Sequence, residues 1–560
     1  MAIIKFFGLG GLGENGKNMY VVSVNEKLFI LDCGLKYPSY DLYGVDGVIP
    51  DFSFLIENEK NIQGLFLSHG HDEHMGAVVE LLKKINVPVF ATHFTMSNLE
   101  WELEAHGIDK VNYRLYRINE DKELKFGDAV VKFFATSHSI PESLGIAVCT
   151  EDGSIIYAPD FIFSSSIDDS YEMGFKNLTN LNDGKVLMLA SESLGVYNVD
   201  RVNNDFLFFN TVSDALAKAK RIIFSMYSND LNRIQKVIDL CIKNGRKIAI
   251  NGRNTQRLVS VGMSTGYLKI PQDKFVNLRF IDDFNNNNDP NLAVIIAGVR
   301  HEPYFMLQRM MTGQDRLIQI TKEDTVVVIS PPIVGTERIA TRTKDQLSKS
   351  GCKVIIVPKS ILKSSHADSE DLKMMYQILK PMYIVPIEGE YRHQYFQKNI
   401  AKSAGYSDEK IIVLDNGEVL GFEDGKASFN FDKIKNGDVL IDGSIVGDIN
   451  EIVLHDRETF SMQGAVIVVT NIDSVHHRIM SGPLLKTVGF GSELENEISE
   501  DITSITYDII YKELQFHELI DWEGLKNKVK EAVTYEIKSI TRKDPVVIPV
   551  IIDVNGGLDQ

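Results

Sequence analysis

Short apolar runs alternate with a helical pattern near the start of the chain. Two runs rich in β-branched and aromatic residues, NMYVVSV (18–24) and KLFILDCGL (27–35), lie two residues apart and predict a β-hairpin. Two further runs, NIQGLFLS (61–68) and PVFATHF (88–94), predict strands, and AVVELLKKI (77–85) between them predicts a helix. Strands that alternate with helices in this way are typical of an α/β fold.

Polar side chains follow several of these predicted strands. SIIYAPDF (154–161) and KVLMLASES (185–193) are apolar runs that end in acidic or hydroxyl residues, and the strand at 61–68 ends before HGHDEH (69–74). An α/β scaffold presents its functional groups on the loops at strand ends. We therefore expect these loops to carry the site.

The pattern beyond residue 203 predicts a second, self-contained α/β domain. Its runs, among them RIQKVIDLCIKNGRKIAI (233–250) and DTVVVISPPIVG (324–335), alternate helix and strand. Two later runs, GCKVIIVPKS (351–360) and MYIVPIEGEYRHQ (382–394), resemble the first domain again, so we interpret the second domain as an insertion. A turn-rich stretch then predicts a linker, followed by a small α/β unit in which INEIVLHD (449–456) is expected to be a strand. The expected boundaries are 1–202 and 351–415 for the first domain, 203–350 for the insertion, 416–448 for the linker and 449–560 for the C-terminal domain.

Composition places the chain among ordinary globular proteins. It has 560 residues, 44% of them hydrophobic and 24% charged, and its longest apolar runs are too short to cross a bilayer. The four cysteines are scattered without a CxxC pair, and no secretory signal is recognisable, so a cytoplasmic location without membrane attachment is expected. A net charge of −18 argues mildly against nucleic acid as a partner, but net charge does not describe a local groove.

The glycine-rich stretch GLGGLGENG (8–16) has the spacing of a dinucleotide-binding loop at Gly8, Gly10 and Gly13. That motif needs a helix immediately afterwards, whereas the next residues predict a strand. We therefore favour a tight glycine turn that lines a site over a nucleotide-binding loop.

Three of the thirteen histidines lie within six positions, at His69, His71 and His74. Alternate positions on a loop after a strand can converge on one ion, so this spacing predicts metal binding. Further ligands are expected at other strand ends, where the candidates are His138, Asp160 and Glu388.

Several motifs of the chain, taken together, resemble those of a known family. HGHDEH, the later SHS, the acid of APDF and the SSH of LKSSHADSEDLK are similar to the metallo-β-lactamase fold with a β-CASP insertion. GGLGENGKN, LDCGLKYP, GVDGVIPD, SES, ISPPIVG, GEYRH and GDINEIVLHDR resemble bacterial ribonuclease J over essentially the whole chain. The resemblance implies a metallo-β-lactamase αβ/βα sandwich, an inserted β-CASP α/β domain and a small C-terminal α/β domain.

The resemblance also implies roles for individual residues. One metal would be held by His69, His71, His138 and Asp160, and a second by Glu73, His74, Asp160 and Glu388. Glu192 and His366 would act as the catalytic acid–base pair, and Ser364 and Ser365 would bind a 5′ phosphate together with His366. The alternative for the two serines is an ordinary turn before a helix that is capped by Asp368 or Ser369.

Two residues depart from the family pattern. Glu73 stands where active members have aspartate, which lengthens the side chain by about 1.5 Å, and Glu388 stands where they have histidine. A carboxylate in place of an imidazole favours harder ions such as Mn²⁺ or Mg²⁺ over Zn²⁺. The expected cofactor is a divalent metal, Mn²⁺ or Zn²⁺ with Mg²⁺ as an alternative, at one or two ions per chain. The chain is similar in this respect to the second, catalytically weak paralogue of some bacteria, although both changes could also be neutral drift within a working site.

These observations lead to two hypotheses. The first is a metal-dependent RNA hydrolase of low intrinsic activity, a 5′-to-3′ exoribonuclease with some endoribonuclease action, in rRNA processing and mRNA decay. Its substrate would be RNA with a 5′ monophosphate. The second is an essentially non-catalytic subunit that stabilises or tunes an active ribonuclease J paralogue in a hetero-oligomer. We also expect the chain to associate with itself as a homodimer or higher homo-oligomer. A small-molecule hydrolase is disfavoured by the long insertion and the SSH motif.

Overall fold

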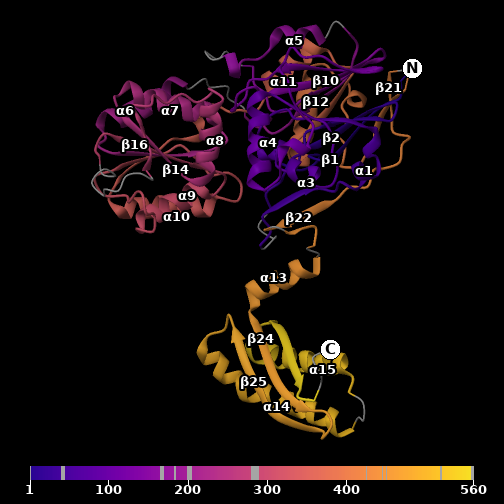
Figure 1. Cartoon of the computed structure of the whole chain (residues 1–560), viewed down its shortest axis with the longest axis vertical. Helices are drawn as coiled ribbons and strands as arrows, with labels where there is room; N and C mark the ends of the chain where they lie inside the picture. Colours follow the sequence, from indigo (N-terminus) through magenta and orange to yellow (C-terminus); the bar gives the residue numbers. More distant parts are fainter. Residues whose placement is uncertain are drawn as a thin grey trace. The chain divides into compact units, whose positions relative to one another are not determined.

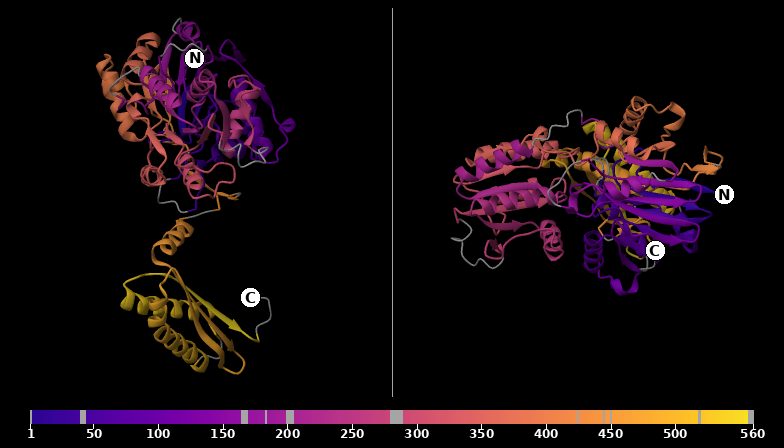
Figure 2. Two further views of the ribbon diagram at one scale, coloured as in Figure 1. Left: turned by 90° about the vertical axis from the view of Figure 1, so that its left-hand side faces the viewer. Right: turned by 90° about the horizontal axis from the view of Figure 1, so that it is seen from above.

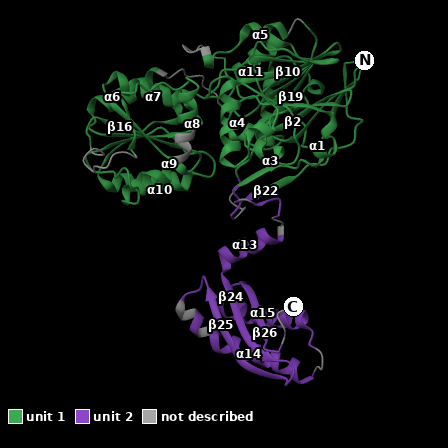
Figure 3. Ribbon diagram, viewed as in Figure 1, with its two compact units in different colours: residues 1–37, 47–439 green, residues 38–46, 440–560 purple. Residues whose placement is uncertain are grey.

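The computed structural model describes residues 2–38, 44–163, 169–181, 184–198, 205–278, 289–423, 425–443, 445–448, 451–516 and 520–555. The chain forms two compact units, residues 1–37 with 47–439 and residues 38–46 with 440–560 (Figure 3). The first unit contains the predicted first domain, apart from residues 38–46, and the insertion. The second contains the predicted C-terminal domain.

Two facing sheets form the first domain of unit 1. One has the strand order β21-β20-β1-β2-β3-β5-β6-β7 and the other the order β19-β12-β11-β10-β9-β8. The strands of the first sheet are β1 Ile4–Gly10, β2 Met19–Val24, β3 Lys27–Leu31, β5 Ile62–Phe66, β6 Val89–Ala91, β7 Leu115–Arg117, β20 Leu420–Glu423 and β21 Lys426–Ser428. Those of the second are β8 Leu124–Phe126, β9 Ala129–Ala135, β10 Leu144–Thr150, β11 Gly153–Ala158, β12 Val186–Glu192 and β19 Tyr383–Ile387, and the short β4 spans Gly47–Pro50.

A closed apolar core fills the space between these sheets. Phe6 of β1 and Val22 of β2 pack with Phe133 of β9 and Ile146 of β10, and all four are almost fully buried. Helices cover the outer faces, with α5, α11 and α12 on the second sheet and α4 against β6 and β7 of the first. The helices of this domain are α1 Ser53–Glu57, α2 Asp72–Met75, α3 Val78–Leu82, α4 His93–Ala105, α5 Phe175–Asn180, α11 Ser369–Leu379 and α12 Tyr391–Ser403. This arrangement is the expected αβ/βα sandwich.

The inserted domain has one parallel sheet with helices on both faces (Figure 1). Its strand order is β15-β14-β16-β13-β17-β18; α6, α7 and α8 pack on one face and α9 and α10 on the other. The two further views in Figure 2 show the same layers. The strands are β13 Ile222–Tyr227, β14 Lys247–Asn251, β15 Phe275–Val276, β16 Leu292–Gly298, β17 Thr325–Val328 and β18 Lys353–Ile356. The helices are α6 Asp205–Lys218, α7 Leu231–Lys243, α8 Arg253–Ser264, α9 Glu302–Met311 and α10 Glu337–Ser350.

The structure moves two of the expected boundaries. The strand of GCKVIIVPKS is β18, which pairs with β17 in the inserted sheet, so the return to the first domain comes after Ile356 rather than at residue 351. Part of the expected linker forms β20, which pairs antiparallel with β1 and extends the first sheet. Both segments are short and lie next to turns, and only their long-range pairing decides which sheet they join.

Unit 2 is a three-stranded sheet covered by two long helices. Its sheet has the order β25-β24-β26, and its core lies between the strands and α14 and α15. The expected strand INEIVLHD is wrong for its described residues, which begin the helix α13, because that short run also fits a helical period. Strand β25, which contains Gly482 and Pro483, was not expected. The elements are β22 Asp438–Asp442, β23 Ile445–Val446, α13 Glu451–Gln463, β24 Ala465–Asp473, β25 Arg478–Val488, α14 Ser492–Phe516, α15 Trp522–Thr541 and β26 Val546–Asp553.

Within the part of the chain that the structure describes, no helix is both long and apolar enough to span a bilayer.

Candidate active site

Six strand ends of the first domain deliver polar side chains to one place. They come from both sheets, so the site lies at one edge of the sandwich, as the polar loops of the sequence predict. The residues are Asp32 after β3, His69, His71 and His74 after β5, His138 after β9, Asp160 after β11, Glu192 at the end of β12 and Glu388 after β19.

Three imidazoles and one carboxylate form a buried first group. His69 Nε2 lies 3.1 Å from His71 Nδ1, and His138 Nε2 lies 3.2 Å from the same atom. The Asp160 Oδ2 atom lies 3.2 Å from His69 Nε2 and 3.6 Å from His138 Nε2. Four ligands around a tetrahedral Zn²⁺ are about 3.3 Å apart, so these atoms could bind one ion.

The other ring nitrogen of each histidine in this group donates a hydrogen bond to an oxygen. Ser68 Oγ donates to Asp32 at 2.7 Å, so towards His69 it can only accept. The remaining two acceptors are carbonyls, so in each neutral ring the inner nitrogen carries a lone pair rather than a hydrogen. Lone pairs about 3 Å apart repel one another unless a cation lies between them, and ligating histidines are oriented by such outer contacts. The outer contacts are His69 Nδ1 to Ser68 Oγ (2.9 Å), His71 Nε2 to Asn229 O (2.9 Å) and His138 Nδ1 to Ser365 O (2.9 Å).

Electrostatics keep two of these rings neutral. Burial, together with the neighbouring His74, lowers the pKa of His69 to about 3. Burial also lowers the pKa of His138 well below its usual value. Neither ring has to lose a proton near neutral pH before it binds a metal, which favours metal binding by this group.

A second group shares Asp160 with the first. His74 Nε2 lies 3.2 Å from Asp160 Oδ2, and with Glu388 these residues could hold another ion. Glu388 is fully buried, and neither of its carboxylate oxygens has a hydrogen-bond partner among the described residues. Its backbone is held in the left-handed region (φ 57°) because its N–H donates to Gly11 O at 2.9 Å and its carbonyl accepts from Ser193 Oγ. A buried carboxylate without partners is costly, so its chemistry fits a cation ligand.

The protonation of this second group differs from that of the first. Burial raises the pKa of Glu388 well above its usual value, and the nearby Asp160 raises it further. Burial alone would lower the pKa of His74, but hydrogen bonds to Asp160 and Asp32 outweigh it and raise that pKa well above its usual value. The side chains of Glu388 and His74 therefore hold protons that a metal has to displace.

Glu73 lies outside the second group. Its Oε1 is 3.6 Å from His71 Nδ1 and its side chain is 31% exposed, whereas the other expected ligands are almost fully buried. Its backbone carbonyl accepts from Asn18 N at 3.0 Å, and its carboxylate is not among the ligand atoms that His74, Asp160 and Glu388 bring together. The structure thus brings together six of the seven expected ligands.

His366 and Glu192 lie beside Asp160. His366 Nδ1 is 2.7 Å from Asp160 Oδ1 and 2.9 Å from Glu192 Oε2. The other oxygen of Glu192 accepts from Phe161 N (2.8 Å) and Ala367 N (2.9 Å), so this carboxylate is fixed. Partial burial would lower the pKa of His366, but Asp160 and Glu192 outweigh it and raise that pKa well above its usual value. His366 can therefore hold a proton, and because 35% of its side chain is exposed it can donate that proton to a bound substrate.

Ser364 and Ser365 form the turn that holds His366. Ser364 Oγ accepts from His366 N at 3.1 Å and from Asn198 Nδ2 at 3.0 Å. The helix that follows is α11, and Asp368 caps it in a capping box with Asp371. The turn and the helix cap are thus both present, and both serines also line the cavity described below.

Two residues of the site were missed in the sequence. Asp32 is fully buried and accepts from Ser68 N (2.7 Å), Tyr157 OH (2.6 Å) and His74 Nδ1 (2.8 Å). It ends the apolar run KLFILD, the same signal that marked the other strand ends. Asn229 comes from the inserted domain, 158 positions after His71, and its contact is made by the backbone carbonyl, so no sequence signal identifies it.

The glycine-rich stretch is a turn beside the site. Strand β1 ends at Gly10 and continues through the turn into β2, with no helix between them. Gly11 O accepts from Glu388 N and from Tyr20 OH (2.9 Å), so the turn lines the second group as expected.

Family models match four segments of the chain. "Metallo-beta-lactamase superfamily" matches residues 12–191 and "Ribonuclease J, beta-CASP domain" residues 219–347. "Zn-dependent metallo-hydrolase RNA specificity domain" matches 359–413, and "Ribonuclease J C-terminal domain" matches 452–554. Fold and site thus define a metallo-β-lactamase-type hydrolase with a β-CASP insertion.

Similar proteins narrow this class. Ribonuclease J2 of Bacillus subtilis is 34% identical over 553 residues, 98% of this chain and 99% of that protein. Ribonuclease J 2 of Staphylococcus aureus is 32% identical over 98% of each chain. The chain belongs to the ribonuclease J family, and its similarity to the second paralogue is confirmed. A solved structure of a protein of unknown function from Enterococcus faecalis matches 75% of this chain and 100% of that one with a TM-score of 0.52 and 14% identity, which supports the fold alone.

Proposed function

We propose that this chain is a 5′-to-3′ exoribonuclease of low intrinsic activity that acts on RNA with a 5′ monophosphate, with some endonuclease action, in rRNA processing and mRNA decay. The observation that carries the proposal is the position of Asp160. One of its oxygens belongs to both candidate metal groups, and the other lies 2.7 Å from His366. A phosphodiester at this point would face metal ligands and a proton donor together.

The side chains divide the work of hydrolysis among them. When bound, a divalent ion, Mn²⁺ or Zn²⁺, supplies Lewis-acid activation of the phosphodiester and of the attacking water. Glu192 holds His366 through Nδ1, so that its other ring nitrogen can donate a proton to the leaving oxygen. Asp160 stabilises the charged form of that ring. The buried setting excludes bulk water from Asp160 and Glu192, which strengthens both interactions.

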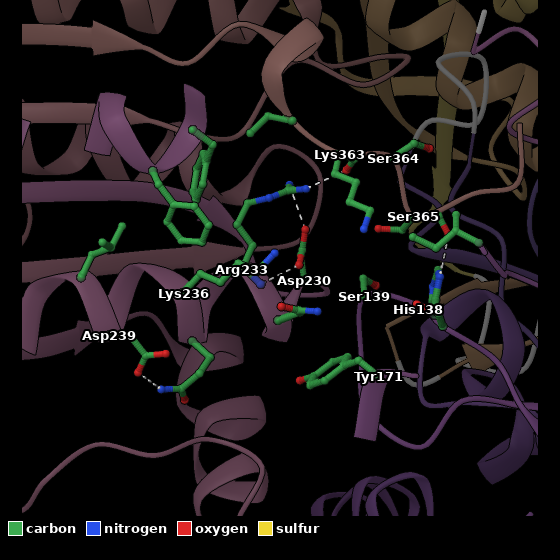
Figure 4. Close-up of a pocket in the computed structure, with 18 of the residues that line it drawn as sticks. His138, Ser139, Tyr171, Asp230, Arg233, Lys236, Asp239, Lys363, Ser364 and Ser365 are labelled. Atoms are coloured by element: carbon green, nitrogen blue, oxygen red, sulfur yellow. Dashed lines mark hydrogen bonds and ion pairs between the residues drawn. The ribbon is translucent and has the colours of Figure 1, made fainter. Parts of the chain in front are cut away.

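A cavity of about 830 Å³ next to the site supports an RNA substrate. It is bounded by the first domain at His138, Ser364 and Ser365 and by α7 of the inserted domain at Arg233 and Lys236 (Figure 4). Its lining contains five basic side chains against two acidic ones: Arg233, Lys236, Lys243, Lys269 and Lys363 against Asp230 and Asp239. Phosphate binding depends on such local positive charge rather than on the net charge of the chain. Ser364 and Ser365 line the same cavity, and their hydroxyl groups can bind a terminal phosphate.

Low activity is supported by the second metal group. Glu73 lies outside it, and both His74 and Glu388 hold protons that a metal must displace. A misplaced or absent second ion near the chemistry reduces the rate, on the order of 10²-fold for a displacement of about 1 Å.

A manganese-titrated assay on 5′-monophosphorylated RNA tests the proposal. The expected result is slow release of nucleotides from the 5′ end that rises with Mn²⁺ and is weaker on RNA with a 5′ triphosphate. A matched His366→Ala variant should lose the activity. Absence of metal-dependent hydrolysis in the natural chain, with both substrates, would overturn the catalytic proposal.

An assembly role, with itself or with an active paralogue, is favoured by a different observation. One face of the unit 2 sheet is apolar and exposed, while α14 and α15 cover the other. Its exposed aliphatic side chains are Met480 (48%), Leu484 (67%), Val488 (44%), Ile548 (44%) and Ile552 (49%). Exposed patches of this kind mark protein–protein contacts.

Truncation near Asp448 tests this second role. The truncated chain should stay folded, since unit 1 has its own cores, but should lose self-association in sedimentation or light scattering, and pairing with an active paralogue in co-purification. Normal assembly of the truncated chain would show that the C-terminal domain is not the contact.

A further inference from the structure

Exposed aromatic side chains cover the first turns of α12, which begins three residues after Glu388. Tyr391 and Tyr395 are 58% and 54% exposed, and their rings stack with centroids 6.2 Å apart at 28°. Phe396 is 38% exposed and lies 4.9 Å from the ring of Tyr197, which is itself 45% exposed. We call these four residues the α12 aromatic face.

The α12 aromatic face is continuous with the candidate active site. Tyr197 lies on the loop after β12, the strand that ends in Glu192, and its hydroxyl donates to Arg392 O at 3.2 Å. The amide of the next residue, Asn198, donates to Ser364 Oγ at 3.0 Å, and Ser364 lines the cavity. A strand that leaves the cavity past Ser364 would therefore reach Tyr197 and then α12.

The chemistry of this face fits nucleic acid bases. An aromatic ring offers a flat surface on which any base can stack. Arg392 on the same helix is 64% exposed and adds a cation, which lies 3.6 Å from Glu390. The whole helix lies within the segment 359–413 that matches an RNA specificity domain. Exposed aromatic rings that cluster in this way mark a surface at which a partner binds.

We propose that the α12 aromatic face stacks the bases of single-stranded RNA just outside the cavity. This inference rests on the proposed RNA substrate and deepens it, because it assigns a second binding element to the same site. Stacking holds a strand irrespective of its sequence, so this face would retain RNA between successive cuts.

Binding of a fluorescent oligouridylate tests the proposal, measured by anisotropy in EDTA so that no cleavage occurs. The Tyr391→Ala/Tyr395→Ala double variant should bind at least about 25-fold more weakly, since each of the two base–aromatic stacks contributes roughly 5- to 150-fold. The slope of log affinity against log salt should stay the same, because no phosphate contact is lost. Tyr391→Phe/Tyr395→Phe keeps both rings and should retain the affinity.

The chain offers a matched control on α14. Tyr507 and Tyr511 have the same four-residue spacing, stack at 6.0 Å and are 44% and 47% exposed, but they belong to unit 2. The Tyr507→Ala/Tyr511→Ala variant should bind oligouridylate as the natural chain does.

An RNA with abasic sugars separates stacking from other causes. Its phosphates are intact, so the natural chain should bind it more weakly, and the Tyr391→Ala/Tyr395→Ala change should cause no further loss. Unchanged oligouridylate affinity in that variant, or an equal loss on abasic RNA, would overturn the inference. Unchanged RNA affinity with an altered oligomeric state in light scattering would assign the face to a protein partner instead. A natural chain that binds no RNA would refute the proposed function itself.

Discussion

The two metal groups share Asp160 but present opposite environments to an ion. In the first, the outer nitrogens of His69, His71 and His138 are fixed by oxygens, and burial keeps His69 and His138 neutral. In the second, the pKa values of His74 and Glu388 are both raised, so protons occupy the positions where a metal would bind. One half of the centre is prepared for a cation, and the other half must be deprotonated first.

The difference also shows how a substitution can leave a fold intact while it changes a site. Glu388 keeps a left-handed backbone because Gly11 and Ser193 hold both ends of its peptide, so the side chain still points inward. At position 388 the difference from the histidine that the resemblance implies is one of donor atom. The backbone hydrogen bonds that position Glu388 are thus present. The second group differs from the first in its donor atoms and in their protonation.

The largest effect is expected from His71→Ala. This change removes one of the four ligands of the first group. His71 Nδ1 lies close to both His69 Nε2 and His138 Nε2, so it is a central ligand. Activity and affinity for the first ion should fall more than a hundredfold, since even loss of a ligand's hydrogen-bond partner typically costs 10–100-fold. Calorimetric metal titration and the RNA assay measure this; a variant that still binds one ion tightly would contradict the assignment of the first group.

Asp32→Asn should have the next largest effect, a loss of about 10- to 100-fold in metal affinity. An amide cannot accept from Ser68, His74 and Tyr157 together as the carboxylate does. Tyr157→Phe removes only one of these donors and serves as the milder control. Equal metal affinity for Asp32→Asn and the natural chain would show that metal binding does not depend on the hydrogen bonds from His74 and Ser68 to the Asp32 carboxylate.

The double change Glu73→Asp and Glu388→His should raise the exonuclease rate tenfold or more. Tenfold needs only about 1.4 kcal/mol of transition-state stabilisation, and a second imidazole ligand removes the buried acid that holds a proton. Either single change should do less, since ligands of one ion act as a unit. An unchanged rate with the second ion shown to be bound would place the defect in the RNA cavity or in a missing partner.

The smallest effect is expected from Ser139→Ala. Ser139 Oγ lies 3.2 Å from His71 Nε2 and donates to Asn229 O at 3.0 Å, so it supports the carbonyl that orients His71. That carbonyl remains in the variant, so the first ion should bind only a few-fold more weakly, in line with about 0.5–1.5 kcal/mol for one hydrogen bond. Binding of a second ion should not change, and a comparable loss at both ions would show that the two groups are not distinct.

The sequence predicts those parts of the molecule that depend on local pattern. The αβ/βα scaffold and the polar strand ends follow from short apolar runs, and the spacing of His69, His71 and His74 indicates a metal group before any fold is known. Asp32 carried the same strand-end signal and was overlooked.

Other features depend on contacts between distant segments. The Asn229 carbonyl reaches His71 only because the inserted domain packs there, and β18 joins the inserted sheet only through its pairing with β17. Glu73 lies on the short helix α2, which begins at Asp72, and the spacing of residues does not show on which side of this helix its carboxylate lies. Neither side-chain direction nor long-range pairing can be deduced from residue spacing.

The number of ions that the purified chain retains tests the central claim most directly. After dialysis against metal-free buffer, elemental analysis should find about one ion or fewer per chain, since three imidazoles, two of them kept neutral by burial, hold an ion better than a group that must lose protons. Glu388→Ala should keep that ion and His71→Ala should lose it. Two tightly held ions in the natural chain would contradict the difference between the two groups.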